Sequence, residues 1–210
     1  MSSKKLVAEI RQLKKSCLKK TVDGRVKEFE KVGEKSSREI FKELCFCILT
    51  ANYNAEHAIV IQKAVGNGFL DFSERKLAKE LKTLGYRYPN TRAKYIVEAR
   101  VHAKNLKKTI HSFEDEQDAR IWFAENVKGL GMKESSHFLR NIGYKNFAII
   151  DFHIVDVLVG HGIIKKPKTI SRRNYVGIED SLKAIGKKIG LNMAELDLYL
   201  WYLETGKVLK

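Results

Sequence analysis

Apolar residues recur at helical spacing along almost the whole chain, and this pattern restricts the fold more than any other feature of the sequence. Near the amino terminus, Leu6, Ile10, Leu13 and Cys17 would lie on one helix face, because residues three and four apart share a face. Alternation of apolar and polar residues, as in a half-buried strand, is nearly absent. The pattern therefore predicts an all-α fold.

Further stretches with the same period are each expected to form a helix. They cover residues 55–65, 74–84, 91–106, 115–126, 134–142, 151–159, 174–189 and 193–205. Gly143, Gly190 and Gly206 stand where helices should stop, because glycine readily adopts the left-handed conformation found at helix C-termini. Most of the breaks between helices are thus expected to be C-caps.

Two segments rich in glycine and polar residues, 21–37 and 143–150, interrupt the helical pattern. We expect them to join two helical domains. The central domain would comprise residues 33–146, and a second domain would pack residues 1–32 with 147–210. An active-site cleft is expected between these domains, since ligand sites favour such clefts.

The chain is strongly basic. Its 210 residues can bury a substantial core, and its 40 lysines and arginines exceed its 25 acidic residues to give a net charge of +15. Such a charge favours a polyanionic partner, with nucleic acid the leading candidate. The alternative is a basic protein whose lysines are simply solvated.

The cysteines and the chain start indicate the compartment. Cys17, Cys45 and Cys47 are too few and too badly spaced for a disulfide framework or a four-cysteine metal site, which implies a reducing environment. The beginning of the chain lacks an apolar signal core, and the apolar runs are shorter than a membrane span. We expect a cytoplasmic, nucleoid-associated protein with no membrane partner.

The segment VKGLGMKESSHFLRNIG reads as a helix, a tight turn and a second helix. Gly129 and Gly131 would let the backbone approach a bulky anion, which the unbonded N–H groups of the following helix start would bind. Lys128 and Arg140 are expected to face this anion. The pattern indicates a helix-hairpin-helix element over about 120–142, although glycine turns also join helices for packing reasons.

The hairpin and the residues after it resemble a known signature. GLGMK, followed by an apolar helix, the turn GYK and then IIDFH, resembles the helix-hairpin-helix superfamily of base-excision DNA glycosylases. In members that also cleave the strand, a lysine follows the hairpin glycines and an aspartate heads a later helix; here these are Lys133 and Asp151. The loop GYKNFAII lacks a proline or second glycine directly before the aspartate, and so departs from the family's Gly/Pro pattern.

The resemblance implies that Lys133 is the nucleophile and Asp151 its electrostatic partner, and the chemistry fits. A neutral amine can attack C1′ of a nucleotide, and the resulting Schiff base acidifies the C2′ proton, so that β-elimination cuts the strand. A cleft wall and nearby cationic side chains would favour the neutral amine. Asp151 can stabilise positive charge on the sugar and also cap the helix that it precedes. Without the resemblance, Lys133 reads as a solvated lysine.

The end of the chain indicates which branch of this superfamily the chain resembles. The iron–sulfur members carry four clustered cysteines near their C-terminus, and this chain has none there. Nearly the whole chain, with its ending LDLYLWYLETGKVLK, resembles the archaeal-type 8-oxoguanine DNA glycosylase/AP lyases. The resemblance implies that the terminal carboxylate at Lys210 reads the extruded base, and that the base stacks between Trp201 and Tyr88. A core position is the alternative for Trp201.

Three further polar residues have weaker signals. CILTANYNAEHA is similar to the turn that fills the gap left by an extruded base in this superfamily, which implies that role for Asn52. A helix C-cap is an equally weighted alternative for this residue. His137 and His153 show no metal-ligand spacing and are expected on the hairpin surface or facing phosphate.

These resemblances imply a bifunctional DNA glycosylase and AP lyase that excises 8-oxoguanine from duplex DNA by base flipping, attack of a lysine on C1′ and β-elimination. We expect a monomer with no metal, iron–sulfur cluster or other cofactor; a structural monovalent cation at the hairpin stays open. The alternatives are a glycosylase of the same fold for another damaged base, a non-catalytic helix-hairpin-helix DNA-binding module, and a basic RNA-binding protein.

Overall fold

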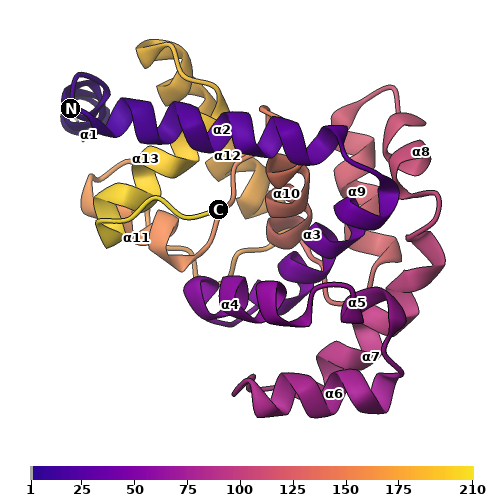
Figure 1. The fold of residues 1–210 in the computed structure, drawn as a ribbon. Coiled ribbons are helices and arrows are strands. Elements are labelled where there is room, and N and C mark those ends of the chain that lie inside the picture. Colours follow the sequence, from indigo (N-terminus) through magenta and orange to yellow (C-terminus); the bar gives the residue numbers. More distant parts are fainter. Residues whose placement is uncertain (1) are drawn as a thin grey trace. The chain divides into compact units, whose positions relative to one another are not determined.

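The computed structural model describes residues 2–210, and their regular structure is helical throughout, with no strand (Figure 1). This confirms the all-α expectation. The chain separates into two compact units. The central unit is Val32–Phe138, and the terminal unit combines the chain up to Lys31 with Leu139–Lys210.

The central unit is built around one buried helix. Its helices are α3 (Ser37–Thr50), α4 (Ala55–Val65), α5 (Gly68–Asp71), α6 (Glu74–Thr83), α7 (Pro89–Ala99), the 3-10 helix η1 (Arg100–His102), α8 (Leu106–His111) and α9 (Glu116–Asn126). Helix α3 contacts α4, α5, α7 and α8, and every residue from Glu43 to Thr50 is buried. A helix that is apolar on nearly all sides forms a core, which the other helices cover.

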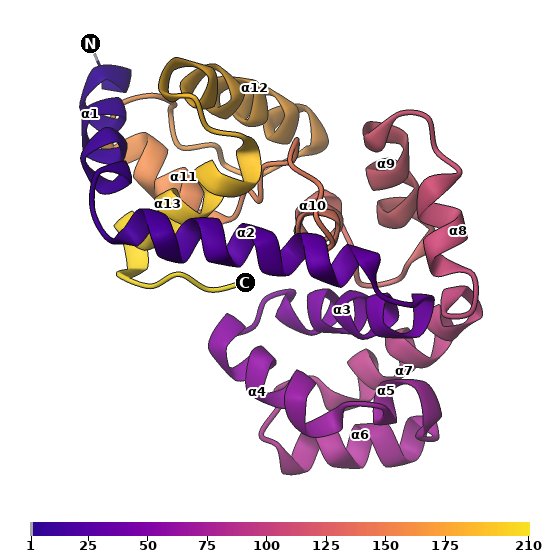
Figure 2. The ribbon, with the colours of Figure 1, turned by 45° about the horizontal axis from the view of Figure 1, so that its top comes forward.

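The terminal unit packs both ends of the chain together. Its helices are α1 (Ser2–Lys14), most of α2 (Leu18–Glu34), α11 (Phe152–Gly160), α12 (Arg172–Ile189) and α13 (Met193–Thr205). Helix α13 contacts α1, α11 and α12, and α1 also lies beside α12 (Figure 2). Helix α10 (Met132–Asn141) begins in the central unit and ends in the terminal unit.

Polar side chains and glycines fix many of the helix ends. An N-cap side chain accepts a hydrogen bond from the first turn at Ser36, Asn54, Ser73, Asp115, Asp151, Ser171 and Asn192. Such a bond satisfies an N–H group that has no partner within the helix. Gly190 and Gly206 end α12 and α13 in the left-handed conformation, which confirms both predicted C-caps.

The expected joint at residues 21–37 is not a break in the helical structure, because α2 continues through most of it, although the two units divide within it, after Lys31. Val22, Val26 and Phe29 are buried at helical spacing on one face of this helix. Gly24 lies inside it with no neighbouring atom near the position of an added Cβ. A glycine inside a helix costs only about 1 kcal/mol relative to alanine, so the buried face outweighs it.

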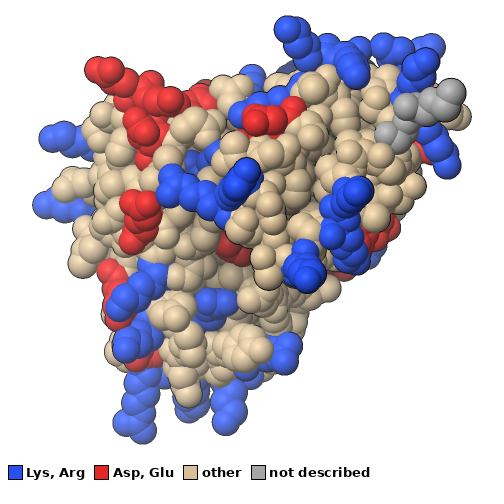
Figure 3. Space-filling model, turned by 180° about the vertical axis from the view of Figure 1, so that it is seen from behind, with Lys and Arg blue, Asp and Glu red and all other residues tan. Residues whose placement is uncertain are grey.

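On the face shown in Figure 3, basic side chains are spread out, with acidic ones in smaller groups between them. Helix α6, which lies at the bottom of Figure 1, carries Arg75, Lys76, Lys79 and Lys82. A membrane crossing would need a long apolar helix, and residues 2–210 contain none.

Candidate active site

The predicted glycine turn connects α9 to α10. Gly129 has a φ of 90°, a left-handed conformation that favours glycine, and an added Cβ would lie 2.8 Å from Cδ2 of Tyr95. The N–H of Ser135 donates to the C=O of Gly131 at 2.9 Å, at the start of α10. The helix-hairpin-helix element is therefore confirmed, and its turn requires glycine at position 129.

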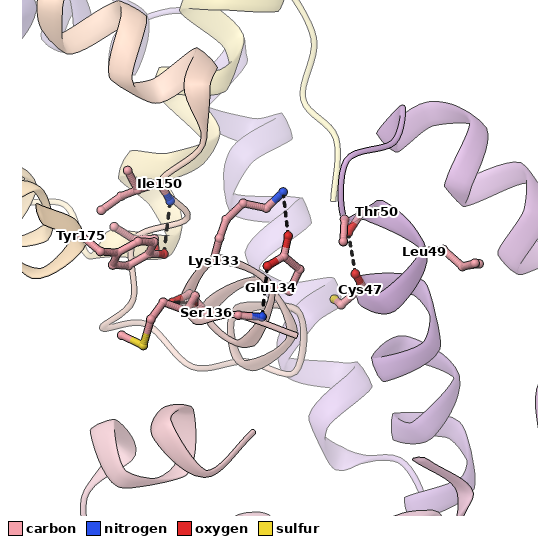
Figure 4. A network of polar contacts seen from close by, with 12 residues as sticks. Cys47, Leu49, Thr50, Lys133, Glu134, Ser136, Ile150 and Tyr175 are labelled. Carbon is pink, nitrogen blue, oxygen red and sulfur yellow. Dashed lines mark hydrogen bonds and ion pairs between the residues drawn. The ribbon is translucent and has the colours of Figure 1, made fainter. Parts of the chain in front are cut away.

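Lys133 is the second residue of α10, and its amine lies 3.3 Å from Oε1 of Glu134 (Figure 4). The other oxygen of this carboxylate accepts a hydrogen bond from the N–H of Gly131 at 3.3 Å. One carboxylate thus holds both the turn and the lysine, whose side chain is 25% exposed. We expected cationic neighbours for Lys133, and the structure places an anion there.

Lys128 and Arg140, both predicted to face a phosphate, lie in opposite environments. The side chain of Lys128 is 67% exposed, and its amine lies 3.1 Å from Oε2 of Glu98. Arg140 is 3% exposed, its Nη1 lies 3.5 Å from Oδ2 of Asp197, and its guanidinium lies 4.5 Å from the centre of the Phe29 ring. Arg140 is therefore not exposed toward a phosphate as predicted, because the carboxylate of Asp197 and the ring of Phe29 lie against its guanidinium.

His137 also departs from the expected surface position. It is 6% exposed, and its ring packs edge-on against Phe46 with 5.5 Å between ring centres. Phe138 and Leu139, the next residues of α10, are fully buried as well. His137 is thus a core residue of the central unit.

Asp151 precedes α11 in the terminal unit. Its Oδ1 accepts a hydrogen bond from the N–H of Ile154 at 3.0 Å, and its C=O accepts one from Val155 at 3.0 Å. The predicted helix cap is confirmed. One carboxylate oxygen is thereby anchored at the positive end of α11, while the residue stays partly exposed.

Trp201 lies beside the start of α11. Its ring packs edge-on against His153 with 5.2 Å between ring centres, and Nδ1 of His153 lies 3.6 Å from Oε1 of Glu204. Trp201 is partly exposed. The structure thus brings the predicted stacking residue next to the helix that Asp151 caps. Lys210 lies in the same unit, beyond the end of α13, and is also partly exposed.

Tyr88 and Asn52 are exposed residues at helix ends of the central unit. Tyr88 precedes α7, is 41% exposed, and has the guanidinium of Arg87 5.0 Å from its ring centre. Asn52 follows α3 with a φ of 57°, which agrees with the helix-ending alternative. Arg92 donates to the C=O of Ala51 at 2.8 Å and so fixes the backbone next to Asn52. The stacking and gap-filling roles stay predictions.

Sequence reasoning missed Glu134 and Arg92. Glu134 stands three residues after Gly131, a spacing typical of a carboxylate that reaches back to cap its own helix, so a signal exists for it. Arg92 has no local signal, because its hydrogen bond to the C=O of Ala51 forms only when α3 and α7 fold together.

These residues offer an amine at one helix start, a carboxylate at another, and aromatic rings. An amine can act as a nucleophile, a carboxylate can stabilise a developing cation, and an aromatic ring can stack on a base. Within residues 2–210, no group of three or more histidine, cysteine, aspartate or glutamate side chains is arranged to hold a metal ion.

Known proteins resemble this chain over nearly its whole length. The family described as 8-oxoguanine DNA glycosylase matches residues 22–191. The 8-oxoguanine DNA glycosylase/AP lyases of Korarchaeum cryptofilum and Methanocaldococcus jannaschii are each 52% identical to it over 98% of this chain, which spans 98% and 99% of theirs.

Solved structures share the fold. The crystal structure of the Methanocaldococcus jannaschii 8-oxoguanine glycosylase/lyase in complex with a 15mer DNA containing 8-oxoguanine has a TM-score of 0.95 and 51% identity, covering 98% of this chain and 99% of that one. The Thermotoga maritima 8-oxoguanine DNA glycosylase has a TM-score of 0.92 and 38% identity, covering 99% and 100%. This chain therefore belongs to the 8-oxoguanine DNA glycosylase family.

Proposed function

We propose that the protein excises 8-oxoguanine from duplex DNA and cleaves the strand at the resulting abasic site, with Lys133 as the nucleophile. One observation carries this proposal: Lys133 follows the glycine turn directly, and Asp151 caps the next helix along the chain. The relatives that share 52% of the residues are named 8-oxoguanine DNA glycosylase/AP lyase.

Base release begins with the neutral amine, because only its lone pair can attack carbon. Lys133 separates from Glu134, gives up a proton and attacks C1′. The bond from C1′ to the base breaks, and the base leaves with the electron pair and takes up a proton. Positive charge develops on the sugar during this step, and the carboxylate of Asp151 stabilises it.

The same lysine accounts for strand cleavage. Opening of the sugar ring gives a Schiff base between Nζ of Lys133 and C1′, which draws electrons away from C2′ and acidifies its proton. Loss of this proton breaks the C3′–O bond and expels the phosphate by β-elimination. Hydrolysis of the imine then returns the free lysine.

The remaining predicted residues would bind DNA. We propose that the extruded base stacks on Trp201 and Tyr88, each stack contributing about 1–3 kcal/mol, and that Lys210 reads its edge. Asn52 would enter the gap in the duplex. The partial exposure of Trp201 and the exposure of Tyr88 support the stacking role. We expect the protein to act as a monomer.

Borohydride trapping tests the nucleophile, because borohydride reduces the Schiff base to a stable amine that links protein to DNA. The wild type should be trapped on a duplex with 8-oxoguanine, and Lys133→Gln should not. Lys128→Gln is the matched control, since it removes an exposed lysine from the same hairpin. It should bind DNA more weakly and still be trapped.

The same assay on a panel of damaged bases tests the substrate. We expect faster release of 8-oxoguanine than of oxidised pyrimidines or alkylated purines. Preference for another base would identify a glycosylase of the same fold for that lesion. Binding to every duplex without release of any base would identify a non-catalytic DNA-binding module.

A further inference from the structure

The chain reaches Asp151 through a buried segment that has no regular structure. Residues 147–150 form neither helix nor strand, and none of the four is more than 7% exposed. Buried backbone N–H groups need acceptors, and each one left without a partner costs about 1–3 kcal/mol. Since no helix or sheet supplies acceptors here, other groups have to supply them.

Two side chains of α12, one helical turn apart, hold this segment. Oε1 of Glu179 accepts a hydrogen bond from the N–H of Ala148 at 3.0 Å. The hydroxyl of Tyr175 donates to the C=O of Ala148 at 2.6 Å and accepts from the N–H of Ile150 at 3.3 Å (Figure 4). Tyr175 and Glu179 are themselves 2% and 1% exposed.

A third side chain completes the set from α13. The N–H of Ile149 donates a hydrogen bond to the carboxylate of Asp197, whose side chain is 11% exposed. Three successive N–H groups, from Ala148 to Ile150, thus each donate to a side-chain acceptor. We call Tyr175, Glu179 and Asp197 the polar clamp.

The two carboxylates of the polar clamp face basic groups. Nη1 of Arg140 lies 3.5 Å from Oδ2 of Asp197, and Nζ of Lys183 lies 3.4 Å from Oε2 of Glu179. A buried carboxylate is costly unless it is paired and hydrogen-bonded, and both conditions are met here. The charges of both carboxylates are therefore compensated by a basic group and a backbone N–H group.

The position of the clamp suggests its purpose. The N–H of Ile150 donates a hydrogen bond to Tyr175, and Ile150 directly precedes Asp151. The carboxylate and C=O of Asp151 accept hydrogen bonds from the first turn of α11. The backbone is thus fixed on both sides of the aspartate. The sequence before it, FAII, contains no proline that would stiffen the chain locally, so the restraint comes from α12 and α13.

We propose that Tyr175, Glu179 and Asp197 are positioning residues for Asp151, holding the backbone that sets the direction of its carboxylate. This inference rests on the proposed role of Asp151 in base release. A carboxylate that stabilises a transition state has to be held closely, because a misplacement of about 1 Å can cost about 100-fold in rate. The polar clamp supplies this restraint through the three residues before Asp151.

A double-mutant cycle tests the proposal. The rate of 8-oxoguanine release in a single turnover is measured for the wild type, Tyr175→Phe, Asp151→Asn and the double variant. We expect Tyr175→Phe to slow release about 10-fold or more, with affinity for the lesion duplex nearly unchanged. In the Asp151→Asn protein, the same substitution should slow release by less than about twofold, because it acts through Asp151.

A merely structural role for Tyr175 gives a different result. If Tyr175→Phe slows release equally with and without Asp151, the tyrosine does not act through the aspartate and the proposal is overturned. Tyr199→Phe is the matched control, because it removes another buried phenol hydroxyl from the terminal unit. It should release 8-oxoguanine at the wild-type rate.

A second pair of variants tests the same proposal if Tyr175→Phe does not fold. Glu179→Gln retains an oxygen that can accept the N–H of Ala148, whereas Glu179→Leu does not. We expect the glutamine to preserve most of the rate and the leucine to lose about 10-fold or more. Equal rates in the two variants would overturn the role of this acceptor.

Different results would refute the proposed function and the proposed role of the polar clamp. Trapping of Lys133→Gln, or normal base release by Asp151→Asn, would refute the proposed mechanism itself. Loss of activity in those two variants together with wild-type rates in Tyr175→Phe and Glu179→Leu would refute only the polar clamp.

Discussion

Gly129 occupies a position that no other residue can take without strain. Its φ is 90°, and an added Cβ would lie 2.8 Å from Cδ2 of Tyr95. A left-handed backbone costs an alanine about 1–2 kcal/mol, and the collision adds to this. We expect Gly129→Ala to lower the free energy of unfolding by about 2 kcal/mol or more, as measured by denaturant titration.

Gly24 provides a control, because alanine at this position should stabilise the protein. It lies inside α2, and an added Cβ would meet no atom within 4 Å. Alanine loses less backbone freedom than glycine on folding, so Gly24→Ala should raise the free energy of unfolding by about 0.5–1 kcal/mol. Similar losses at both positions would show that the turn at Gly129 has no special requirement.

Asp197 should make stability depend on pH. The pKa of its carboxyl is raised from 3.8 to about 6, chiefly because the group is removed from water. The positive charge of Arg140 opposes this shift, and the negative charge of Asp151 adds to it. Between these two pKa values the folded protein binds more protons than the unfolded chain, so the contribution of Asp197 to stability falls as the pH rises.

Comparison with Asp197→Asn isolates this effect. The free energy of unfolding of the wild type, minus that of the variant, should fall from pH 4 to pH 7, with most of the loss complete just above the folded pKa of about 6. Denaturant titrations at several pH values measure this difference. A difference that stays constant or rises would contradict the raised pKa.

At the residue scale, the sequence identifies candidates within a local motif but not their surroundings. Lys133 and Asp151 stand in a recognisable order after the glycines, so their candidacy could be predicted. The burial of Arg140 could not, because Asp197 and Phe29 reach it only through folding. Tyr175 gives no local sign of its contact with Ala148 for the same reason.

At the scale of elements, most helices could be predicted from apolar spacing. The expected ranges 55–65 and 193–205 coincide with α4 and α13. The helix expected over 91–106 instead ends at Ala99 and continues as the short η1. Periodicity shows which residues share a face, but the exact end of a helix depends on hydrogen bonds to residues elsewhere, such as that from Arg100 to Phe69.

The α9–α10 hairpin is the element predicted to bind DNA phosphate, and salt dependence tests it. Each phosphate contact releases counterions, so losing one contact lowers the slope of log affinity against log salt by about 1. We expect this change for Lys128→Gln, measured by duplex binding over a range of salt concentrations. Lys5→Gln, which changes an exposed lysine of α1, should keep the wild-type slope.

Two results would contradict this prediction. If Lys128→Gln and Lys5→Gln give the wild-type slope, Lys128 makes no phosphate contact. If both lower it equally, the basic surface attracts DNA without a special role for the hairpin.

At the scale of the whole molecule, the fold class could be predicted because one period runs through nearly the entire sequence. The exact division into units could not. The chain was expected to divide near residues 32 and 146, and the units divide after Lys31 and after Phe138, inside α2 and α10. Glycines mark where helices stop, whereas a unit is defined by contacts among distant residues. The expected active-site cleft stays a prediction.

The identity of the reacting amine is the central claim, and mass spectrometry after borohydride trapping tests it most directly. The wild type is trapped on a duplex containing 8-oxoguanine, the DNA and protein are digested, and the modified peptide is sequenced. We predict that the reduced sugar adduct lies on Nζ of Lys133. An adduct on another lysine or on the amino-terminal amine would contradict the mechanism.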